Sequence, residues 1–496
     1  MSVEIRDLFI HDSLSKKKEK FVPLEKGYIG MYVCGPTVYS DVHLGNVRTF
    51  VSFDVMYRHL LFLGYKVRYV RNITDVGHLL DNGEDRVSKR ALLEKLEPME
   101  IVQKYSNSFH AMMDVFNTHK PSIEPRATQH IIEQIEMVQK IIDNGYGYEK
   151  NGSVYFDTIK FHKEKQSYGQ LSGRVIEELM VETRDDLKNQ DEKNHPSDFA
   201  IWMKAAPEHI MKWNSPWSIG FPGWHLECSV MSTKYLGEKF DIHGGGNDLK
   251  FPHHENEVAQ NIGACNCDPA NYWLHTNMLL MNGRKMSKSD GNTISPYELF
   301  SGDSPHVTKG YTPMTVKFFM LQSHYSSTLD LTDGALIASE KGYKKLMTSL
   351  STLDGLQTNG ASSELDSSIN EILEEFLVHM CDDFNTPRAI ASLFELVTKI
   401  NSLKEGHIDV NQLSKEALDN LKKVYPQYIV EVLGLVNDMD SGDNDVLNGV
   451  MDLIIDLRQD ARNEKNWAIS DKIRDGLAKS NITIKDGKEG TSWNLS

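Results

Sequence analysis

Strand, helix and strand follow one another in GYIGMYVCG (27–35), LGNVRTFVSFDVMYRHLLFL (44–63) and KVRYVRNIT (66–74). The first and third stretches are apolar and rich in β-branched and aromatic residues, which predicts two buried strands. The middle stretch has apolar residues at helical spacing and is followed by Gly64, a residue typical of the position after a helix. This order predicts a parallel sheet, whose ligands bind at the carboxyl ends of its strands, here residues 34–43.

The α/β pattern is interrupted and then resumes. It returns in FDIHGGGNDL (240–249), in a helical stretch from His253 and in YWLHTNMLLMNGRKMSKS (272–289). The stretch before it holds short strand-like pieces and a polar run at 182–198, which is predicted to be a solvated loop. Helical periodicity dominates 335–422, and a small helix-plus-strand module closes the chain. The expected fold class is therefore α/β, with a split Rossmann-type parallel-sheet domain followed by a helical bundle and a small C-terminal module.

Composition limits the classes of function. The chain has 496 residues, with 54 Lys+Arg against 70 Asp+Glu and a net charge of −16. This length predicts about three domains with sizeable cores. An acidic total argues only weakly against a nucleic-acid partner, because local basic patches decide such binding. No apolar run suits a membrane span, and the charged start has no apolar signal segment. Five cysteines fit a reducing compartment, so a cytoplasmic protein without membrane contact is expected.

The sharpest local motif is KMSKS, from Lys285 to Ser289. Two lysines three positions apart, with serine between them and Gly/Asn/Asp-rich flanks, suit a mobile clamp on a polyphosphate. Such a clamp places positive charge where negative charge develops on a transferring phosphate. The alternative is an ordinary solvated Lys/Ser loop.

A second motif, His43-Leu44-Gly45-Asn46, lies where the first strand's turn enters the helix. Gly45 lets a nucleotide approach the backbone, and a helix N-terminus favours phosphate. The side chains of His43 and Asn46 can both donate hydrogen bonds to phosphate oxygens. The alternative is that they only cap the helix.

Four residues have the chemistry of a zinc site. His253 and Glu257 are four positions apart on an expected helix, and therefore on one face. Cys34 ends a strand at the ligand edge of the sheet, and Cys228 lies in a segment with Gly, His and Glu. Thiolate, imidazole and carboxylate ligands together suit Zn²⁺, although buried cysteines are often inert packing residues. Packing is the interpretation for Cys265 and Cys267. A zincin protease is excluded, because the position of its second histidine holds Val258.

The two motifs together resemble the HIGH and KMSKS signatures of class I aminoacyl-tRNA synthetases. Three further segments are similar to the cysteinyl-tRNA synthetase family: CGPTVY (34–39), GWHLECS (223–229), and DIHGGG (241–246) followed by FPHHENE (251–257). The resemblance covers essentially the whole chain, including DFNTP (383–387) and the tail from Trp467 to Trp493. Two positions depart from the expected pattern: the last signature residue, usually His, is Asn46, and Val76-Gly77-His78 replaces further acidic residues and lysine.

The resemblance implies ATP-dependent activation of L-cysteine and transfer of the cysteinyl group to the 3′ end of cysteine tRNA. It implies one Zn²⁺ per subunit, Mg²⁺ with ATP, and a monomer. The implied catalytic residues are His43, Asn46, Lys285 and Lys288. Those implied to bind ATP are Pro36, Thr37, His43, Gly45, Asn46 and Lys288. Those implied to bind cysteine are Thr37, Thr74, Trp224 and Asp248, and the implied zinc ligands are Cys34, Cys228, His253 and Glu257.

The resemblance also implies a division of the chain. Residues 20–125 and 206–315 would form the catalytic domain, 126–205 a connective insertion, 316–334 a stem-contact segment, 335–425 the helical bundle, and 430–496 an anticodon-binding module. In that module Arg462, Asp471 and Asp486 match positions where the family contacts anticodon bases. Carboxylates accept from base amines and arginine stacks or pairs, whereas the alternative is a set of solvated surface charges.

Three other functions compete with tRNA charging. A related ligase that couples activated cysteine to an amino-sugar would share the zinc and both motifs but would lack the C-terminal tail. A non-catalytic, tRNA-binding paralogue is expected to lose the KMSKS lysines, which are both present here. A structural zinc protein would need no KMSKS loop.

Overall fold

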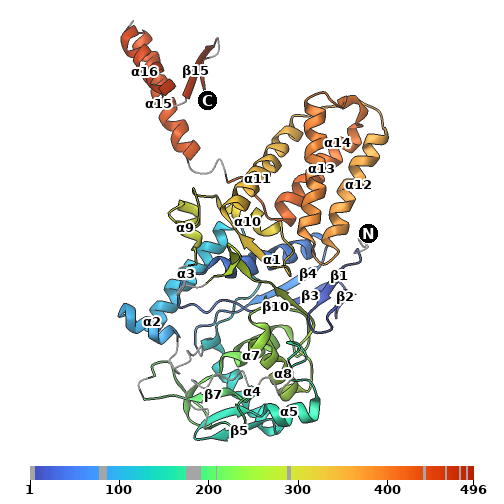
Figure 1. The fold of residues 1–496 in the computed structure, drawn as a ribbon, viewed down its shortest axis with the longest axis vertical. Helices are drawn as coiled ribbons and strands as arrows, with labels where there is room; N and C mark the ends of the chain where they lie inside the picture. Colours follow the sequence, from blue (N-terminus) through green and yellow to red (C-terminus); the bar gives the residue numbers. More distant parts are fainter. Residues whose placement is uncertain are drawn as a thin grey trace. The chain divides into compact units, whose positions relative to one another are not determined.

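The computed structural model describes residues 6–76, 86–174, 192–207, 209–286, 292–438, 443–463, 466–479, 482–487 and 490–495. The chain divides into two compact units, Met1–Val436 and Asn437–Ser496 (Figure 1). Across the described ranges, no helix has both the length and the apolar character needed to cross a bilayer.

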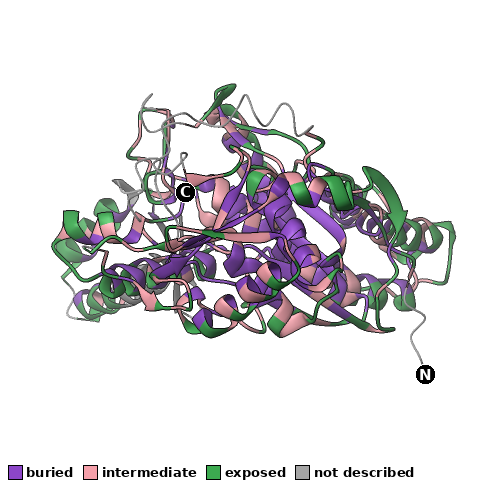
Figure 2. Cartoon of the chain, turned by 90° about the horizontal axis from the view of Figure 1, so that it is seen from below, coloured by how far each residue is buried: buried purple, intermediate pink, exposed green. Residues whose placement is uncertain are grey.

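Unit 1 contains the predicted parallel sheet. Its strands lie in the order β11-β10-β3-β4, and all neighbours pair in parallel. The strands are β3 (Tyr28–Val33), β4 (Lys66–Arg71), β10 (Phe240–Gly246) and β11 (Ala270–Thr276). Figure 2 shows buried residues concentrated in the strands and helices of this central region. The parallel order confirms the strand–helix–strand interpretation and places the end of β3 beside the end of β10.

Helix α1 (Leu44–Phe62) makes the crossover between β3 and β4. It packs closely on the sheet, because a Cβ on Gly244 of β10 would lie 2.2 Å from the ring of Phe53. Only glycine therefore allows the helix to lie at this distance from the strand. The close packing holds the first turn of α1 directly beside the carboxyl ends of the strands.

A second sheet is built from residues that lie, in the sequence, between the two halves of the first sheet. Its antiparallel strands are β5 (Gly147–Lys150), β6 (Ser153–Phe156), β7 (Phe199–Lys204), β8 (Trp213–Asn214) and β9 (Ile219–Pro222). The connective insertion was predicted to end at 205, but β7 pairs with β9, so this sheet continues to Pro222. Apolar side chains such as Phe156 and Trp202 form its core.

The polar run at 182–198 was predicted to be a solvated loop, and its residues 182–191 lie outside the described residues. Asp198 corrects this interpretation, since only 2% of its surface is exposed. Its carboxylate accepts hydrogen bonds from the backbone N–H of Thr158 at 3.0 Å and the Tyr148 hydroxyl at 2.8 Å. A buried carboxylate with these donors is stable inside the fold.

The remaining elements of unit 1 are two small sheets and a set of helices. The sheets contain β1 (Phe9–Asp12) with β2 (Lys17–Lys20), and β12 (Leu279–Met281) with β13 (Arg284–Lys285) and β14 (Leu329–Leu331). The helices before residue 330 are α2 (Arg86–Glu94), α3 (Pro98–Val115), η1 (Ala127–His130), α4 (Ile131–Asp143), α5 (Thr158–Lys165), α7 (Trp224–Leu236), η3 (Lys250–His254), α8 (Glu255–Cys265), α9 (Pro296–Ser301) and α10 (Pro313–Leu321).

Helices dominate the rest of unit 1, as the periodicity predicts. They are α11 (Asp333–Asp354), α12 (Glu364–Met380), α13 (Thr386–Lys404), η4 (Val410–Gln412), α14 (Lys415–Pro426) and η5 (Gln427–Val432). The anticodon module was predicted to begin at 430, but Val432, Leu433 and Leu435 are all buried in unit 1. The boundary between the two units therefore lies after Val436.

Unit 2 contains α15 (Asp443–Asn463), α16 (Trp467–Lys479), β15 (Ile482–Gly487) and β16 (Gly490–Leu495). The two strands pair in an antiparallel hairpin. Its small core includes Met451, Leu477 and Ile482. This is the helix-plus-strand module expected at the end of the chain, with one further helix before it.

Candidate active site and metal centre

The four predicted zinc ligands lie together. The ligand atoms of Cys34, Cys228, His253 and Glu257 are all within 4.8 Å of one another, and all four residues are buried. The Cys34 and Cys228 sulfur atoms are 3.6 Å apart, and His253 Nε2 is 3.4 Å from Cys228 Sγ and 3.1 Å from Glu257 Oε1. Two sulfurs, an imidazole and a carboxylate form a donor set whose charge a divalent cation would balance.

Separate elements bring these ligands together. Cys34 follows β3, and its N–H donates to Gly244 O of β10 at 3.0 Å. The next residue must be glycine, because a Cβ on Gly35 would lie 1.6 Å from Asn72 O. Cys228 lies on α7 and Glu257 in the first turn of α8. His253 was expected on the same helix as Glu257, but it lies in the π-helical turn η3 just before α8.

The electrostatics of the cluster favour a bound cation. Burial and a hydrogen bond donated to Cys228 raise the pKa of the Cys34 thiol. Burial opposes ionisation of Cys228, but the hydrogen bond from Cys34 and the nearby His253 lower its pKa. Burial likewise opposes ionisation of Glu257, yet His243 and His253 lower its pKa. The anionic Cys228 and Glu257 in turn raise the pKa of His253 to about 10 against the effect of burial, so a protonated imidazole supplies the positive partner whose place a bound cation would take.

Three histidines that received no individual role from the sequence surround the ligands. His243 Nε2 lies 2.8 Å from Glu257 Oε2, His254 Nε2 lies 3.3 Å from Cys34 Sγ, and His225 Nδ1 lies 2.9 Å from His253 Nδ1. Partners of this kind orient metal ligands and fix their tautomers. His243 and His254 also form an overlapping candidate set with Cys34 and Glu257. The high density of histidines in residues 225–254 is the sequence feature from which these supporting residues could have been predicted.

Two cavities share part of their lining, and the smaller of them reaches this cluster at Cys34. The smaller, of about 220 Å³, is lined by Cys34, Pro36, Thr37 and Trp224 among others. The larger, of about 580 Å³, is lined by Gly45 and Lys285. Both cavities are bordered by Ser40, Asp41, Val42, His43, Asn46, Thr49, Gly246 and Asp248. A ligand could therefore extend from the sulfur cluster, past the first turn of α1, to the lysine-bearing strand.

The first turn of α1 forms the wall shared by both cavities. His43 is the N-cap: its Nδ1 accepts from the Asn46 N–H at 3.3 Å, and its own N–H donates to Asn46 Oδ1 at 3.4 Å. His43 and Asn46 therefore do cap the helix, as the alternative interpretation of this motif predicts. Because Oδ1 faces the cap, the amide Nδ2 of Asn46 is the atom that can donate to a ligand.

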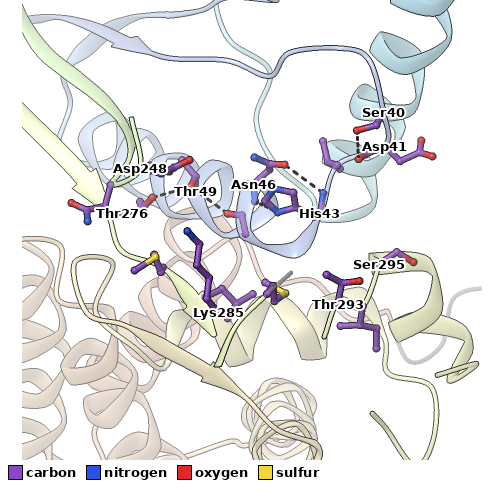
Figure 3. A pocket seen from close by; sticks show the side chains of 18 of the residues that line it. Ser40, Asp41, His43, Asn46, Thr49, Asp248, Thr276, Lys285, Thr293 and Ser295 are labelled. Carbon is purple, nitrogen blue, oxygen red and sulfur yellow. Dashed lines mark hydrogen bonds between the residues drawn. The ribbon is translucent and has the colours of Figure 1, made fainter. Parts of the chain in front are cut away.

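Lys285 reaches the larger cavity from β13. Figure 3 shows its side chain extending toward the side from which Asn46, Thr49 and Asp248 project. β13 pairs with β12 in a tight hairpin, and this hairpin leads into the KMSKS segment. Lys288, the second lysine of the motif, lies outside the described residues.

The comparisons with known proteins cover almost the whole chain. Residues 20–341 match the family model for the tRNA synthetases class I (C) catalytic domain, and residues 375–437 match the DALR domain. The cysteine–tRNA ligase of Bacteroides thetaiotaomicron is 49% identical over 98% of this chain and 99% of its own length. That of Parabacteroides distasonis is 50% identical over 99% of both, and that of Deinococcus radiodurans is 45% identical over 98% and 96%.

The chain belongs to the cysteine–tRNA ligase family. Its fold is also that of solved class I synthetases: the methionyl-tRNA synthetase of Mycobacterium tuberculosis, in complex with methionyl-adenylate, superposes with a TM-score of 0.57 over 82% of this chain and 90% of that one. At 13% identity, this likeness concerns the fold alone. The expected α/β fold, a Rossmann-type parallel-sheet domain followed by a helical region and a C-terminal module, is confirmed.

One residue expected in the cysteine pocket of this cysteine–tRNA ligase family member lies behind it. Thr74 is buried and is not among the residues lining either cavity. Its N–H donates to Pro36 O at 3.0 Å, its carbonyl accepts from Val38 N–H at 3.2 Å, and its hydroxyl accepts from Asn72 Nδ2 at 3.1 Å. Thr74 therefore supports the segment that carries Pro36 and Thr37.

Other predicted residues are not among those that line the two cavities. Cys265 and Cys267 lie outside both candidate ligand sets. Arg462 and Asp471 lie in unit 2, on α15 and α16, and Asp471 pairs with Arg474 at 3.1 Å. Asp486 lies on β15, and its side chain is outside the described residues. Of the residues that replace the usual acidic run, Gly77 and His78 are also outside the described residues.

Substitutions at Asn46 separate capping from catalysis. Asn46→Asp keeps an acceptor for the His43 N–H but removes the Nδ2 donor and adds a charge that repels phosphate. We expect this variant to melt near the wild-type temperature and to activate the amino acid more slowly than the wild type. Asn46→Ala should also activate it more slowly, whereas Asn46→His should stay active. Single-turnover adenylate formation with parallel thermal melts measures both effects. Wild-type rates in the Asp and Ala variants would show that Asn46 only caps the helix.

Proposed function

We propose that this chain activates L-cysteine with ATP and transfers the cysteinyl group to the 3′ end of cysteine tRNA, with zinc selecting the cysteine thiolate. The observation that carries the proposal is the position of the Cys/His/Glu cluster at the end of a cavity that continues to the first turn of α1 and to Lys285. The membership in the cysteine–tRNA ligase family supports the same reaction.

The smaller cavity is the proposed cysteine pocket. Cys34 brings the metal cluster to its wall, and Trp224 contacts the cluster, with its ring centroid 4.5 Å from that of His253. Thr37 lies on the same wall, and Asp248 offers a carboxylate to the substrate ammonium. These groups bind the side chain and the ammonium of cysteine separately, and two such contacts orient its carboxylate for the reaction.

The proposed metal is Zn²⁺ held by Cys34, Cys228, His253 and Glu257. The set with two cysteines is preferred over the overlapping one, because sulfur-rich sites favour zinc and because His243 and His254 already bond to Glu257 and Cys34 as supporting partners. A zinc ion held there would supply a Lewis acid that prefers the thiolate of cysteine to the hydroxyl of serine.

The larger cavity is the proposed ATP site, where magnesium accompanies the nucleotide. Gly45 and the N-terminus of α1 approach the phosphates, and His43 and Asn46 donate to their oxygens. The cysteine carboxylate attacks the α-phosphate, which releases pyrophosphate and forms cysteinyl-adenylate. Lys285, with Lys288, neutralises the charge that builds on the phosphates as the bond breaks. The terminal ribose hydroxyl of tRNA then takes the acyl group.

Two assays test the proposed function. Cysteine-dependent ATP–pyrophosphate exchange measures activation, and charging of cysteine tRNA measures transfer. We expect both. An amino-sugar ligase would pass the first and fail the second, whereas a non-catalytic paralogue or a structural zinc protein would fail both. The monomeric state and the cytoplasmic location stay predictions, tested by light scattering and cell fractionation.

Unit 2 is proposed to bind the anticodon through Arg462, Asp471 and Asp486. A chain ending at Val436 removes this unit but keeps Leu433 and Leu435, which are buried in unit 1. We expect the truncated protein to fold, to retain ATP–pyrophosphate exchange and to charge tRNA poorly. Charging by the truncated chain at the full-length rate would refute the assignment. A cut at 430 is the unsuitable choice, because it removes part of the buried core of unit 1.

A further inference from the structure

Arg48 is a buried cation on α1 that is not among the residues lining either cavity. It follows the His43-to-Asn46 motif by one helical half-turn, and only 1% of its surface is exposed. Gly45, Asn46 and Thr49 line the larger cavity, whereas Arg48 does not. Its side chain instead points to the far side of the cavity wall, where the chain leaves β11 toward the KMSKS hairpin.

The guanidinium of Arg48 joins two segments that are distant in sequence. Nη1 donates to the carbonyls of Asn277 at 3.0 Å and Met278 at 2.7 Å. Nη2 donates to the carbonyls of His324 at 3.2 Å and Ser327 at 2.5 Å. Four carbonyl oxygens are thus bound by one planar group. Lysine has a single ammonium and cannot reproduce this fork, in which Nη1 and Nη2 each donate to two carbonyls.

The segment held by Arg48 is the root of the KMSKS hairpin. Asn277, Met278 and Leu279 line the larger cavity, and β12 starts at Leu279 and turns into β13, which carries Lys285. The same root is tied to the second segment by backbone bonds from Asn277 N–H to Tyr325 O at 2.8 Å and from Leu329 N–H to Met278 O at 3.2 Å. Arg48, which directly follows the first turn of α1, therefore links these bonds to the start of the helix.

The charge of Arg48 has no carboxylate partner among the ion pairs of the described residues. Burial lowers its pKa to about 10, so the side chain stays charged at neutral pH. A buried cation held only by carbonyl dipoles is costly for stability compared with an apolar side chain of similar size. Arginine is therefore needed here for the geometry of its hydrogen bonds and not for a contribution to folding stability.

We propose that Arg48 is a positioning residue for amino-acid activation: it sets the spacing between the phosphate-binding turn of α1 and the hairpin that carries Lys285. The inference rests on the proposed function, because the spacing matters only if Asn46 and Lys285 act on the same ATP. Reactants misplaced by about 1 Å lose on the order of 10²-fold in rate. Loss of the Arg48 side chain uncouples the hairpin root from α1, while the backbone bonds from the root to Tyr325 and Leu329, the metal cluster and the cysteine pocket stay in place.

The test compares Arg48→Met and Arg48→Lys with the wild type in single-turnover adenylate formation at varied ATP and varied cysteine. We expect Arg48→Met to lower the activation rate by about 10²-fold and to raise KM for ATP, with KM for cysteine within about twofold of the wild type. The activation rate and the KM for ATP of Arg48→Lys should lie between those of Arg48→Met and the wild type. If Arg48→Met fails to fold, Arg48→Lys carries the comparison alone.

Arg58→Met is the matched control. Arg58 is another buried arginine of α1, but it bonds to Asp54 at 2.8 Å and to Asn117 O at 2.7 Å, away from both cavities. We expect it to lower the melting temperature and leave both KM values unchanged. The same pattern in the Arg48 variants, or wild-type kinetics in Arg48→Lys, would overturn the inference. Absence of exchange in the wild type would instead refute the proposed function.

Discussion

Replacing Cys228 with serine is expected to abolish the preference for cysteine over serine. Cysteine and serine differ only in sulfur and oxygen, so the shape of the pocket separates them poorly. Protein synthesis needs a discrimination of about 10⁴–10⁵, which corresponds to about 5.5–7 kcal/mol. Zinc lowers the pKa of a bound thiol and prefers sulfur to a hydroxyl oxygen, so the loss of one zinc ligand removes most of this difference.

The measurement is kcat/KM for cysteine and for serine in ATP–pyrophosphate exchange, with the zinc content of each preparation. Removal of zinc from the wild type by a chelator should have the same effect as Cys228→Ser. Cys265→Ser is the control, because Cys265 lies outside both ligand sets and should retain zinc and selectivity. A metal-free enzyme that folds normally and still rejects serine would overturn the role of zinc as the selector.

Loss of either KMSKS lysine is expected to slow adenylate formation with little effect on cysteine binding. Removing a donor aimed at a transition state costs about 3–4 kcal/mol, or about 10²–10³ in rate. Lys288→Ala should show this effect, and Lys285→Ala a related one, because Lys285 lines the larger cavity. Rapid-quench measurement of the first turnover gives the rate, and calorimetry gives the affinity for cysteine.

Arg284→Ala provides a control for the two lysine variants. Arg284 precedes Lys285 on β13, carries the same charge, and is not among the residues lining the larger cavity. Neighbouring residues of a strand point to opposite faces, so this variant should activate cysteine at the wild-type rate. If Lys288→Ala activates cysteine as fast as Arg284→Ala does, the KMSKS lysines do not stabilise the transition state.

Local patterns in the sequence were enough to predict the architecture. The strand–helix–strand order at 27–74 predicted parallel pairing of β3 and β4 because a helical crossover returns the chain in the same direction. The same reasoning placed Cys34 and the His43-to-Asn46 turn at the ligand edge of the sheet. Both follow from periodicity and connection rules, which depend on residues close together in the chain.

The individual partners within the site required the tertiary structure. The four proposed zinc ligands could be named from their chemistry and from the family resemblance. The supporting roles of His243 and His254 appear only when β10 and the segment before α8 are placed beside Cys34. Arg48 bonds to carbonyls 229 to 279 positions away, and no local pattern marks such an arginine.

The sequence by itself determined the type and order of the elements and the chemistry available at the strand ends, because hydrophobic period and residue type are local properties. The tertiary structure decided that Thr74 lies behind the cavity, that Asp198 is buried, and that unit 1 extends to Val436. These depend on long-range packing: whether a polar side chain meets water or a partner is set by the elements that cover it, and those elements come from distant parts of the chain.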